Sequence, residues 1–359
     1  AIINFGRTSI MILKRDTKII QDFFGQETLE KLKYFVDPQT RHSHIIYSMA
    51  VGADSLEKQI RNFAMAISTL LQDESSTSWL EEMKPRLLQD NMNNVRAAVG
   101  EVVAYAELLH ADFIVKPIAA THNHPTPEYV VMDHDNNEFI VEVFSKQLCE
   151  ETTRRIGTSQ EFLTQIGNSG PGVYFDIQEL SPYGYSNDSV TEDAVSKICA
   201  IKGREHQALP EKPFIIWVDI QNSGDFFLGD QNYADPIISW RGTLTSGHYW
   251  YGMYGKKNLP VFNDYAIFCH RGEKNFYPMQ HDGRFLLSKK ISGMFFKFEK
   301  SIVFFENPNA EQKISMSTRH QLSMFRDFDL GKSMIDFADG LVKQKIETAY
   351  AEIEALAKK

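Results

Sequence analysis

Three glutamates in the middle of the chain lie on elements that could bring acids together. Glu101 lies in NVRAAVGEVVAYAELLHA, whose apolar stripe predicts a helix over 94–110. Glu128 opens the extended run EYVVM, directly after Pro127, and Glu142 lies in the next run, EFIVEVF. Carboxylate oxygens are the hard ligands that Mg²⁺ prefers, so Glu128 and Glu142 are candidate metal ligands.

The two extended runs predict a β-hairpin. DHDNN joins 128–132 to 138–144, and Asp and Asn side chains favour turns. A turn centred near Asp135–Asn136 makes the numbers of paired residues sum to roughly 270, because antiparallel register follows from the turn. Glu142 is therefore expected opposite Glu128 or very near it.

A cation between these two positions would allow two acids to lie opposite each other in the hairpin. Like charges on paired strands repel, and a bound metal ion removes that repulsion. The ion could polarise a phosphodiester and activate a water molecule, while a nearby lysine stabilises the developing negative charge. Lys146 is the first candidate, because residues 142, 144 and 146 share one face of a strand.

The segments VGEVVAYAEL, PTPEYVV and EFIVEVFSK together resemble the PD-(D/E)XK, or restriction-endonuclease-like, nuclease superfamily. The resemblance covers about 95–220 and continues through KICAIKGREHQALPEKPFIIWVDI. It implies a mixed sheet flanked by helices. Glu101 matches the acid of the first helix, Pro127-Glu128 matches the Pro-Asp pair with Glu in place of Asp, and Glu142 matches the acid of the third motif.

The third motif departs from the family pattern at its lysine. Position 144 is Phe where the family has Lys, and Lys146 comes two residues later. Lys197 or Lys202, from the following predicted helix, could replace it. If no lysine reaches the metal, the chain is an inactive relative.

The function expected from the resemblance is a Mg²⁺- or Mn²⁺-dependent endonuclease that hydrolyses DNA, in bacterial antiviral defence against foreign DNA. Glu101, Glu128 and Glu142 would bind the metal. The alternative is a catalytically inactive nuclease fold that serves as a binding or assembly subunit of a defence complex.

Each of these residues also has an ordinary structural interpretation. Glu101 could be a solvated residue on the flank of a helix, Glu128 and Glu142 an exposed cross-strand pair, and Lys146 a strand-end lysine in solvent. Glu142 fits this interpretation least, because apolar neighbours predict a buried strand and a buried carboxylate is costly without a partner.

A second metal chemistry is suggested by THNHPTPE. His122 and His124, with Glu128, could bind Zn²⁺ in a hydrolase. Ordinary loop histidines explain the segment better, and one of them could also contact a phosphate.

Composition restricts the class of protein. The chain of 359 residues is 43% hydrophobic and 24% charged, with a net charge of −9, which excludes a disordered chain and a protein that coats nucleic acid. Three scattered cysteines form no disulfide framework. The first 16 residues do not read as a secretory leader, and no apolar run could span a membrane, so a cytoplasmic location is expected.

One stretch of this acidic chain is basic. Residues 256–300 hold nine Lys or Arg against four Asp or Glu, a balance of +5, and aromatic residues alternate with the basic ones. Basic and aromatic side chains together can bind nucleic acid. Alternatively, the aromatics form the core and the lysines a solvated face.

The predicted organisation has four parts: a helical region at 1–93, the nuclease-like core at 94–222, an aromatic-rich α+β region at 223–330 and a C-terminal helix at 331–359. Within them, Ser78 is expected to cap a helix. Further helices are predicted at 17–36, 55–74, 78–91 and 190–208, and strands at 213–220, 265–270, 284–288, 291–298 and 301–305.

The C-terminal helix carries a heptad of apolar residues: Ile335, Val342, Ala349 and Leu356. The stripe predicts a helix docked on its own domain. The alternative is a seam for a second copy or a partner subunit.

Overall fold

The chain is a mixed α/β protein with an open six-stranded sheet. The computed structural model describes residues 4–38, 42–118, 126–145, 150–167, 190–201, 211–220, 231–240, 243–262 and 276–358. The chain divides into two compact units. The first consists of Ala1–His110, Val143–Pro182 and Asp219–Gly224, and the second of Ala111–Glu142, Tyr183–Val218 and Asp225–Lys359.

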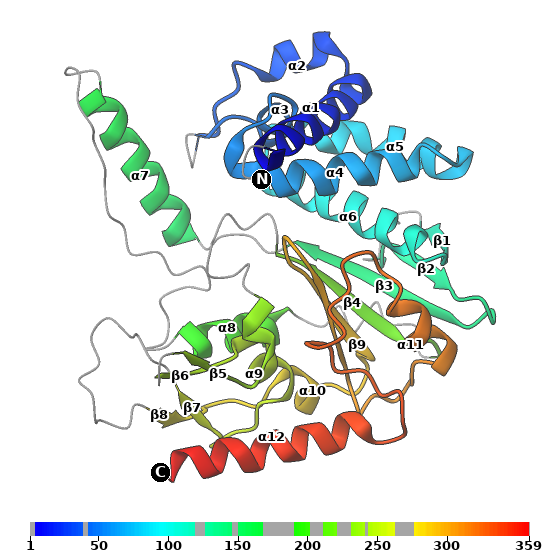
Figure 1. Cartoon of the computed structure of the whole chain (residues 1–359), viewed down its shortest axis with the longest axis vertical. Helices are drawn as coiled ribbons and strands as arrows, with labels where there is room; N and C mark the ends of the chain where they lie inside the picture. Colours follow the sequence, from blue (N-terminus) through cyan, green and yellow to red (C-terminus); the bar gives the residue numbers. More distant parts are fainter. Residues whose placement is uncertain are drawn as a thin grey trace. The chain divides into compact units, whose positions relative to one another are not determined.

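The first unit is helical (Figure 1). Its helices are α1 (Asn4–Phe24), α2 (Gln26–Leu32), α3 (Ile45–Ala50), η1 (Asp54–Leu56), α4 (Glu57–Leu70), α5 (Glu74–Leu87), α6 (Met92–His110) and α7 (Glu150–Gly167). Ile60, Phe63 and Ile67 are fully buried on one face of α4, as their spacing predicts. Because α6 packs on α4 and α5, the helical unit extends beyond the predicted boundary at 93.

The start of α5 differs from the prediction. The helix begins at Glu74, and Asp73 is the N-cap, since its carboxylate accepts from the amide of Ser76 at 3.0 Å. Ser76 Oγ donates to the carbonyl of Leu70 at 2.8 Å. The polar residues before Ser78 therefore form the first turn of the helix. Asp and Ser are about equally good N-caps, and here the contacts of Asp73 and Ser76 start the helix earlier than Ser78.

The sheet has the order β1-β2-β3-β4-β9-β10. Its strands are β1 (Ile114–Pro117), β2 (Tyr129–Met132), β3 (Glu138–Ser145), β4 (Phe214–Asp219), β9 (Gly293–Lys297) and β10 (Ile302–Glu306). The predicted hairpin and the predicted strands at 213–220, 291–298 and 301–305 are confirmed. All residues of β4 are buried, as expected of an almost wholly apolar strand inside a sheet. The sequence did not reveal β1.

Aromatic rings fill the core on one face of the sheet. Phe325 lies 5.2 Å from Phe295 and 5.7 Å from Trp217, measured between ring centroids. Phe113 packs 5.4 Å from Phe139 and 6.2 Å from Phe325, so rings from separate segments join into one cluster.

The rest of the second unit is built from short elements: α8 (Val190–Ala200), η4 (Gln231–Ala234), β5 (Ile237–Trp240), β6 (Thr243–Ser246), α9 (His248–Tyr254), β7 (Pro260–Phe262), β8 (Phe276–Pro278), α10 (Arg284–Leu287), α11 (Met316–Leu322) and α12 (Leu341–Ala357). The strand predicted at 284–288 is wrong, since this segment forms α10. A short apolar run does not distinguish helix from strand by periodicity. The strand predicted at 265–270 lies outside the described residues.

Four aromatic residues of the basic stretch belong to the core. Phe285, Phe295, Phe296 and Phe298 are at most 1% exposed, so these rings are not available to stack on bases. Phe276 and Tyr277 are half-buried. The core interpretation therefore holds for the four buried rings, whereas Lys297 is fully buried and does not belong to a solvated face.

The C-terminal helix is shorter than predicted. It covers Leu341–Ala357 and follows Gly340, whose φ of 85° is left-handed. Before it, the amide of Met334 donates to the carbonyl of Phe304 at 2.8 Å, so 331–340 runs beside β10 and is not helical.

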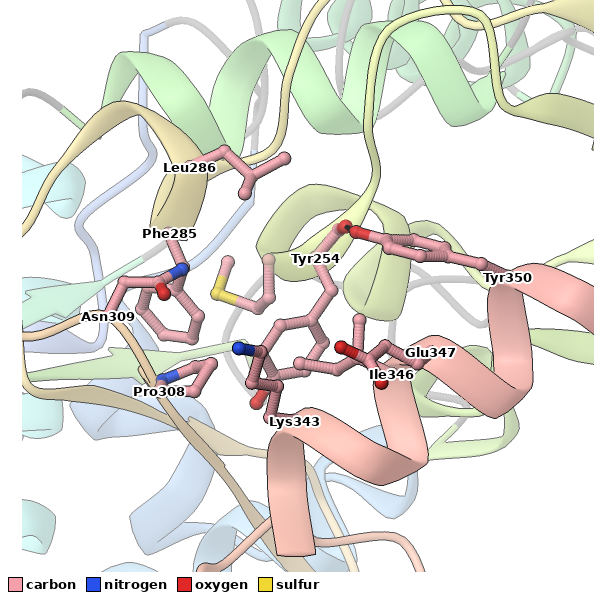
Figure 2. A pocket seen from close by; sticks show the side chains of 10 residues that line it. Tyr254, Phe285, Leu286, Pro308, Asn309, Lys343, Ile346, Glu347 and Tyr350 are labelled. Atoms are coloured by element: carbon pink, nitrogen blue, oxygen red, sulfur yellow. Dashed lines mark hydrogen bonds between the residues drawn. The ribbon is translucent and has the colours of Figure 1, made fainter. Parts of the chain in front are cut away.

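The apolar stripe of α12 is covered by its own unit. Val342, Ile346, Ala349 and Ile353 are buried, and Figure 1 shows α12 in red beside β7 and α10. Tyr350 donates its hydroxyl proton to the carbonyl of Tyr254. A pocket of about 140 Å³ remains between α12, α9 and α10, lined by Ile346, Tyr254 and Phe285 among others (Figure 2). The docked-helix interpretation holds, and the stripe is not an open seam.

Truncation of this stripe should destabilise the protein. Ile353→Ala removes a fully buried side chain and is expected to lower the free energy of unfolding by about 2 kcal/mol. Leu356→Ala, at a half-buried position of the same helix, should cost clearly less. Urea unfolding measures both. A change of oligomeric state in Ile353→Ala without a loss of stability would instead indicate a partner seam.

Candidate functional site

The register of the β2–β3 hairpin agrees with the prediction. Tyr129 pairs with Val141 and Met132 pairs with Glu138, so paired numbers sum to 270. Glu128 directly precedes Tyr129, and the same register puts it opposite Glu142. The carbonyl of Glu128 accepts from the amide of Ile118 at 2.9 Å, which extends the ladder to β1 by one step.

Asp133 fixes the turn that sets this register. Its carboxylate accepts from the amides of Asp135 at 3.0 Å and Asn137 at 2.8 Å. The hydroxyls of Thr318 and Ser315 donate to the same carboxylate at 2.6 and 3.0 Å. Burial raises the pKa of Asp133, but the hydrogen bonds from Thr318 and the other donors outweigh it and hold the pKa below its ordinary value.

Glu142 is a buried carboxylate in β3. It is 1% exposed, and its strand neighbours Val141 and Val143 are buried as well. Glu128 is half-buried. The interpretation of an exposed cross-strand pair is therefore wrong for Glu142, and this strand carries an acid where the fold would otherwise place an apolar residue.

Glu138 provides the contrast on the same strand. It shares a face with Glu142, because side chains alternate, but its side chain is 39% exposed and forms an ion pair with Lys212. The hydrogen bond from Lys212 lowers the pKa of Glu138. An ordinary surface glutamate of this strand thus has a nearby cation and solvent, and it serves as a matched control for Glu142.

Among the predicted lysines, only Lys197 is described. It lies in the last turn of α8 and its side chain is exposed. Lys146 and Lys202 lie outside the described residues, as do His122 and His124 of the zinc alternative.

Glu101 belongs to the first unit, where it is bound by an arginine. Arg86 Nη1 donates to Glu101 Oε2 at 2.5 Å, and Nη2 donates to Oε1 at 2.7 Å. Glu101 is 7% exposed, so it is not a solvated residue on the flank of a helix. Arg86 comes from the last turn of α5 and Glu101 from α6, so the pair links two neighbouring helices.

Two buried residues of the first unit were missed from the sequence. Asp219, at the end of β4, is fully buried, and Ser145, at the end of β3, is 6% exposed. Both lie against Gly100 of α6, and Ser145 Oγ donates to the carbonyl of Arg96 at 3.3 Å. Two signals were present in the sequence: an acid that ends an apolar strand, and a glycine inside a helical pattern, which often marks close packing.

The carboxylates of the second unit suit a hard divalent cation. Mg²⁺ is commonly held by one or two carboxylates, with waters and substrate phosphates completing its coordination. Glu128 and Glu142 supply two such groups on paired positions. Among the residues that the structure describes, no three His, Cys, Asp or Glu side chains gather into a metal-binding group.

Within the described ranges, each helix is too short or too polar to cross a lipid bilayer. Comparison of the chain with protein-family models, with curated proteins and with solved structures gives no significant match.

Proposed function

We propose that this protein is a metal-dependent endonuclease that hydrolyses DNA phosphodiester bonds with Mg²⁺ or Mn²⁺, in defence against foreign DNA. The observation that carries the proposal is Glu142, a carboxylate that is 1% exposed in the register position opposite Glu128. Burial of an acid at this point is costly unless its charge is used or compensated. In this proposal the charge is used: a divalent cation bound by Glu128 and Glu142 would be attracted by both carboxylates.

The order of elements supports a restriction-endonuclease-like core. Helix α6 is followed by the antiparallel strands β1, β2 and β3, then by α7 and α8, and then by β4, which lies next to β3 in the sheet. The amide of Ile140 donates to the carbonyl of Pro213 at 2.8 Å, where β4 begins. This order of elements along the chain supports the proposed core, which would consist of α6, β1 to β4 and the helices between β3 and β4.

In this proposal Glu128 and Glu142 hold the ion. When bound, the metal polarises the phosphodiester and lowers the pKa of a coordinated water molecule. A lysine, from Lys146, Lys197 or Lys202, stabilises the negative charge that develops on the phosphate. The resemblance also implies Glu101 as a ligand, but both oxygens of its carboxylate accept hydrogen bonds from Arg86.

The test is cleavage of plasmid and linear DNA with Mg²⁺ or Mn²⁺. Glu142→Gln keeps the shape of the side chain but removes its charge, so cleavage should fall at least about 100-fold. Glu138→Gln makes the same change on the same face of the same strand and should keep the wild-type rate. Equal cleavage by wild type and Glu142→Gln would refute the role of Glu142.

A second candidate function is a catalytically inactive subunit that binds DNA or a partner protein. Phe144 at the lysine position of the third motif favours it, and so does the arginine that is bound to Glu101. Absence of cleavage with every metal tested, together with retained binding, would support this candidate over the nuclease.

A further inference from the structure

Both oxygens of the Glu101 carboxylate are engaged by one guanidinium. The two hydrogen bonds from Arg86, at 2.5 and 2.7 Å, form the fork arrangement in which arginine and carboxylate match best. A metal ligand must offer at least one of these oxygens. Because arginine stays charged at all accessible pH values, the metal would also have to displace a permanent cation.

The two partners differ in exposure. The side chain of Glu101 is 9% exposed, whereas that of Arg86 is 44% exposed. The carboxylate therefore lies on the inner side of the pair and the guanidinium on the outer side. Arg86 Nη1 also lies 3.6 Å from Met83 Sδ on the same helix, which further restricts the guanidinium.

A guanidinium held in this way is suited to an anion. Its N–H donors form a rigid planar fork, and 44% of the Arg86 side chain is exposed to solvent, where a ligand can reach it. Phosphate groups are recognised by such forks, and fixing the arginine beforehand reduces the entropy lost on binding.

We propose that Glu101 is a positioning residue that holds Arg86 for contact with a backbone phosphate of the nucleic acid, and that it is not a ligand of the metal. The inference rests on the proposed function, since it assigns Arg86 to the DNA on which the protein acts. Glu101, which the resemblance implies as a third metal ligand, is thereby assigned to a phosphate contact made by Arg86 in the first unit.

DNA affinity tests the phosphate contact. Fluorescence anisotropy of a labelled duplex, measured with EDTA between about 50 and 200 mM salt, gives the affinity and its salt dependence. Arg86→Gln should weaken binding about fivefold and reduce the slope of log K against log salt by about one. Glu101→Gln should weaken binding in the same direction. Lys31→Gln, which removes a lysine from an exposed pair with Glu27, should change neither quantity by as much.

Metal affinity tests the second part of the proposal, that Glu101 is not a ligand of the metal. Titration with Mn²⁺ in the absence of DNA, followed by electron paramagnetic resonance of the free ion, should show binding weakened at least tenfold in Glu142→Gln. Glu101→Gln and Arg86→Gln should bind Mn²⁺ within about twofold of wild type. Tenfold weaker binding in Glu101→Gln, or tighter binding in Arg86→Gln, would overturn the inference.

The outcomes separate the two proposals. A wild type that binds neither Mn²⁺ nor DNA contradicts the proposed function and the phosphate contact with it. If wild type binds both, an unchanged salt slope in Arg86→Gln contradicts the inference alone. Should a single variant unfold, the double variant Arg86→Met with Glu101→Met removes both charges at similar volume, and it should show the same loss of slope.

Discussion

Gly100→Ala is expected to lower the free energy of unfolding by about 3 kcal/mol or more. A Cβ atom at this position would lie 2.3 Å from Ser145 Oγ and 2.8 Å from Asp219 Oδ2. Both distances are far below van der Waals contact. Ser145 and Asp219 are buried at the ends of β3 and β4, so neither can move into solvent without breaking the packing around it.

The sign of this effect is informative because helix propensity predicts the opposite. Alanine favours an α-helix over glycine by about 1 kcal/mol, and Gly100 lies inside α6. The collision should exceed this gain, since α6 approaches the strand ends closely only where the side chain is absent. Chemical denaturation of wild type and Gly100→Ala measures the difference.

A double-mutant cycle identifies the cause. Ser145→Ala removes the nearer of the two colliding oxygens, so Gly100→Ala should cost less in that background than in wild type. The remaining cost comes from Asp219. An increase in stability of about 1 kcal/mol in Gly100→Ala would instead mean that α6 adjusts freely and that propensity alone decides.

His248 should make the stability of the protein depend on pH, by about 1.4 kcal/mol per unit over the range where it titrates only in the unfolded chain. Its ring is 3% exposed, stacks 4.2 Å from Tyr233 and lies 4.5 Å from Tyr249. Burial lowers the pKa of His248 from 6.5 to about 3. The folded protein therefore keeps this imidazole neutral at pH values at which the unfolded chain protonates it.

The direction follows from the lowered pKa. Above pH 6.5 the His248 imidazole is mostly neutral in both the folded and the unfolded chain, so its full contribution to stability is present. As the pH falls, the unfolded state gains a proton and the folded state does not, so stability decreases until the pH approaches about 3. Between pH 7 and pH 5 the loss should be about 2 kcal/mol.

The control removes the titrating group. His248→Gln should abolish this part of the pH dependence, whatever its effect on stability at neutral pH. His320→Gln, on the exposed surface of α11, should keep the wild-type slope. Equal slopes in wild type and His248→Gln between pH 7 and pH 5 would show that His248 does not stay neutral in the folded protein.

Local sequence was sufficient for the hairpin that carries the candidate site. DHDNN predicted the turn, the turn predicted a register near 270, and the observed pairs sum to 270. The apolar run at 213–220 predicted a buried strand, because a strand covered on both faces carries apolar side chains at nearly every position. The start of α5, the helical state of α10 and the length of α12 differ from prediction because caps and short apolar runs are decided by a few competing side-chain contacts.

The sequence by itself determined the periodic features: the register that puts Glu128 opposite Glu142, the helix that carries Glu101 and the buried strand within 213–220. Only the tertiary structure decided that Glu142 is buried while Glu138 is not, that Arg86 binds Glu101 and that Gly100 lies against Ser145 and Asp219. The physical reason is the distance along the chain over which each feature is determined. Strand and helix periods are properties of neighbouring residues, whereas burial and ion pairing depend on which distant segments pack together, and a single sequence does not specify that locally.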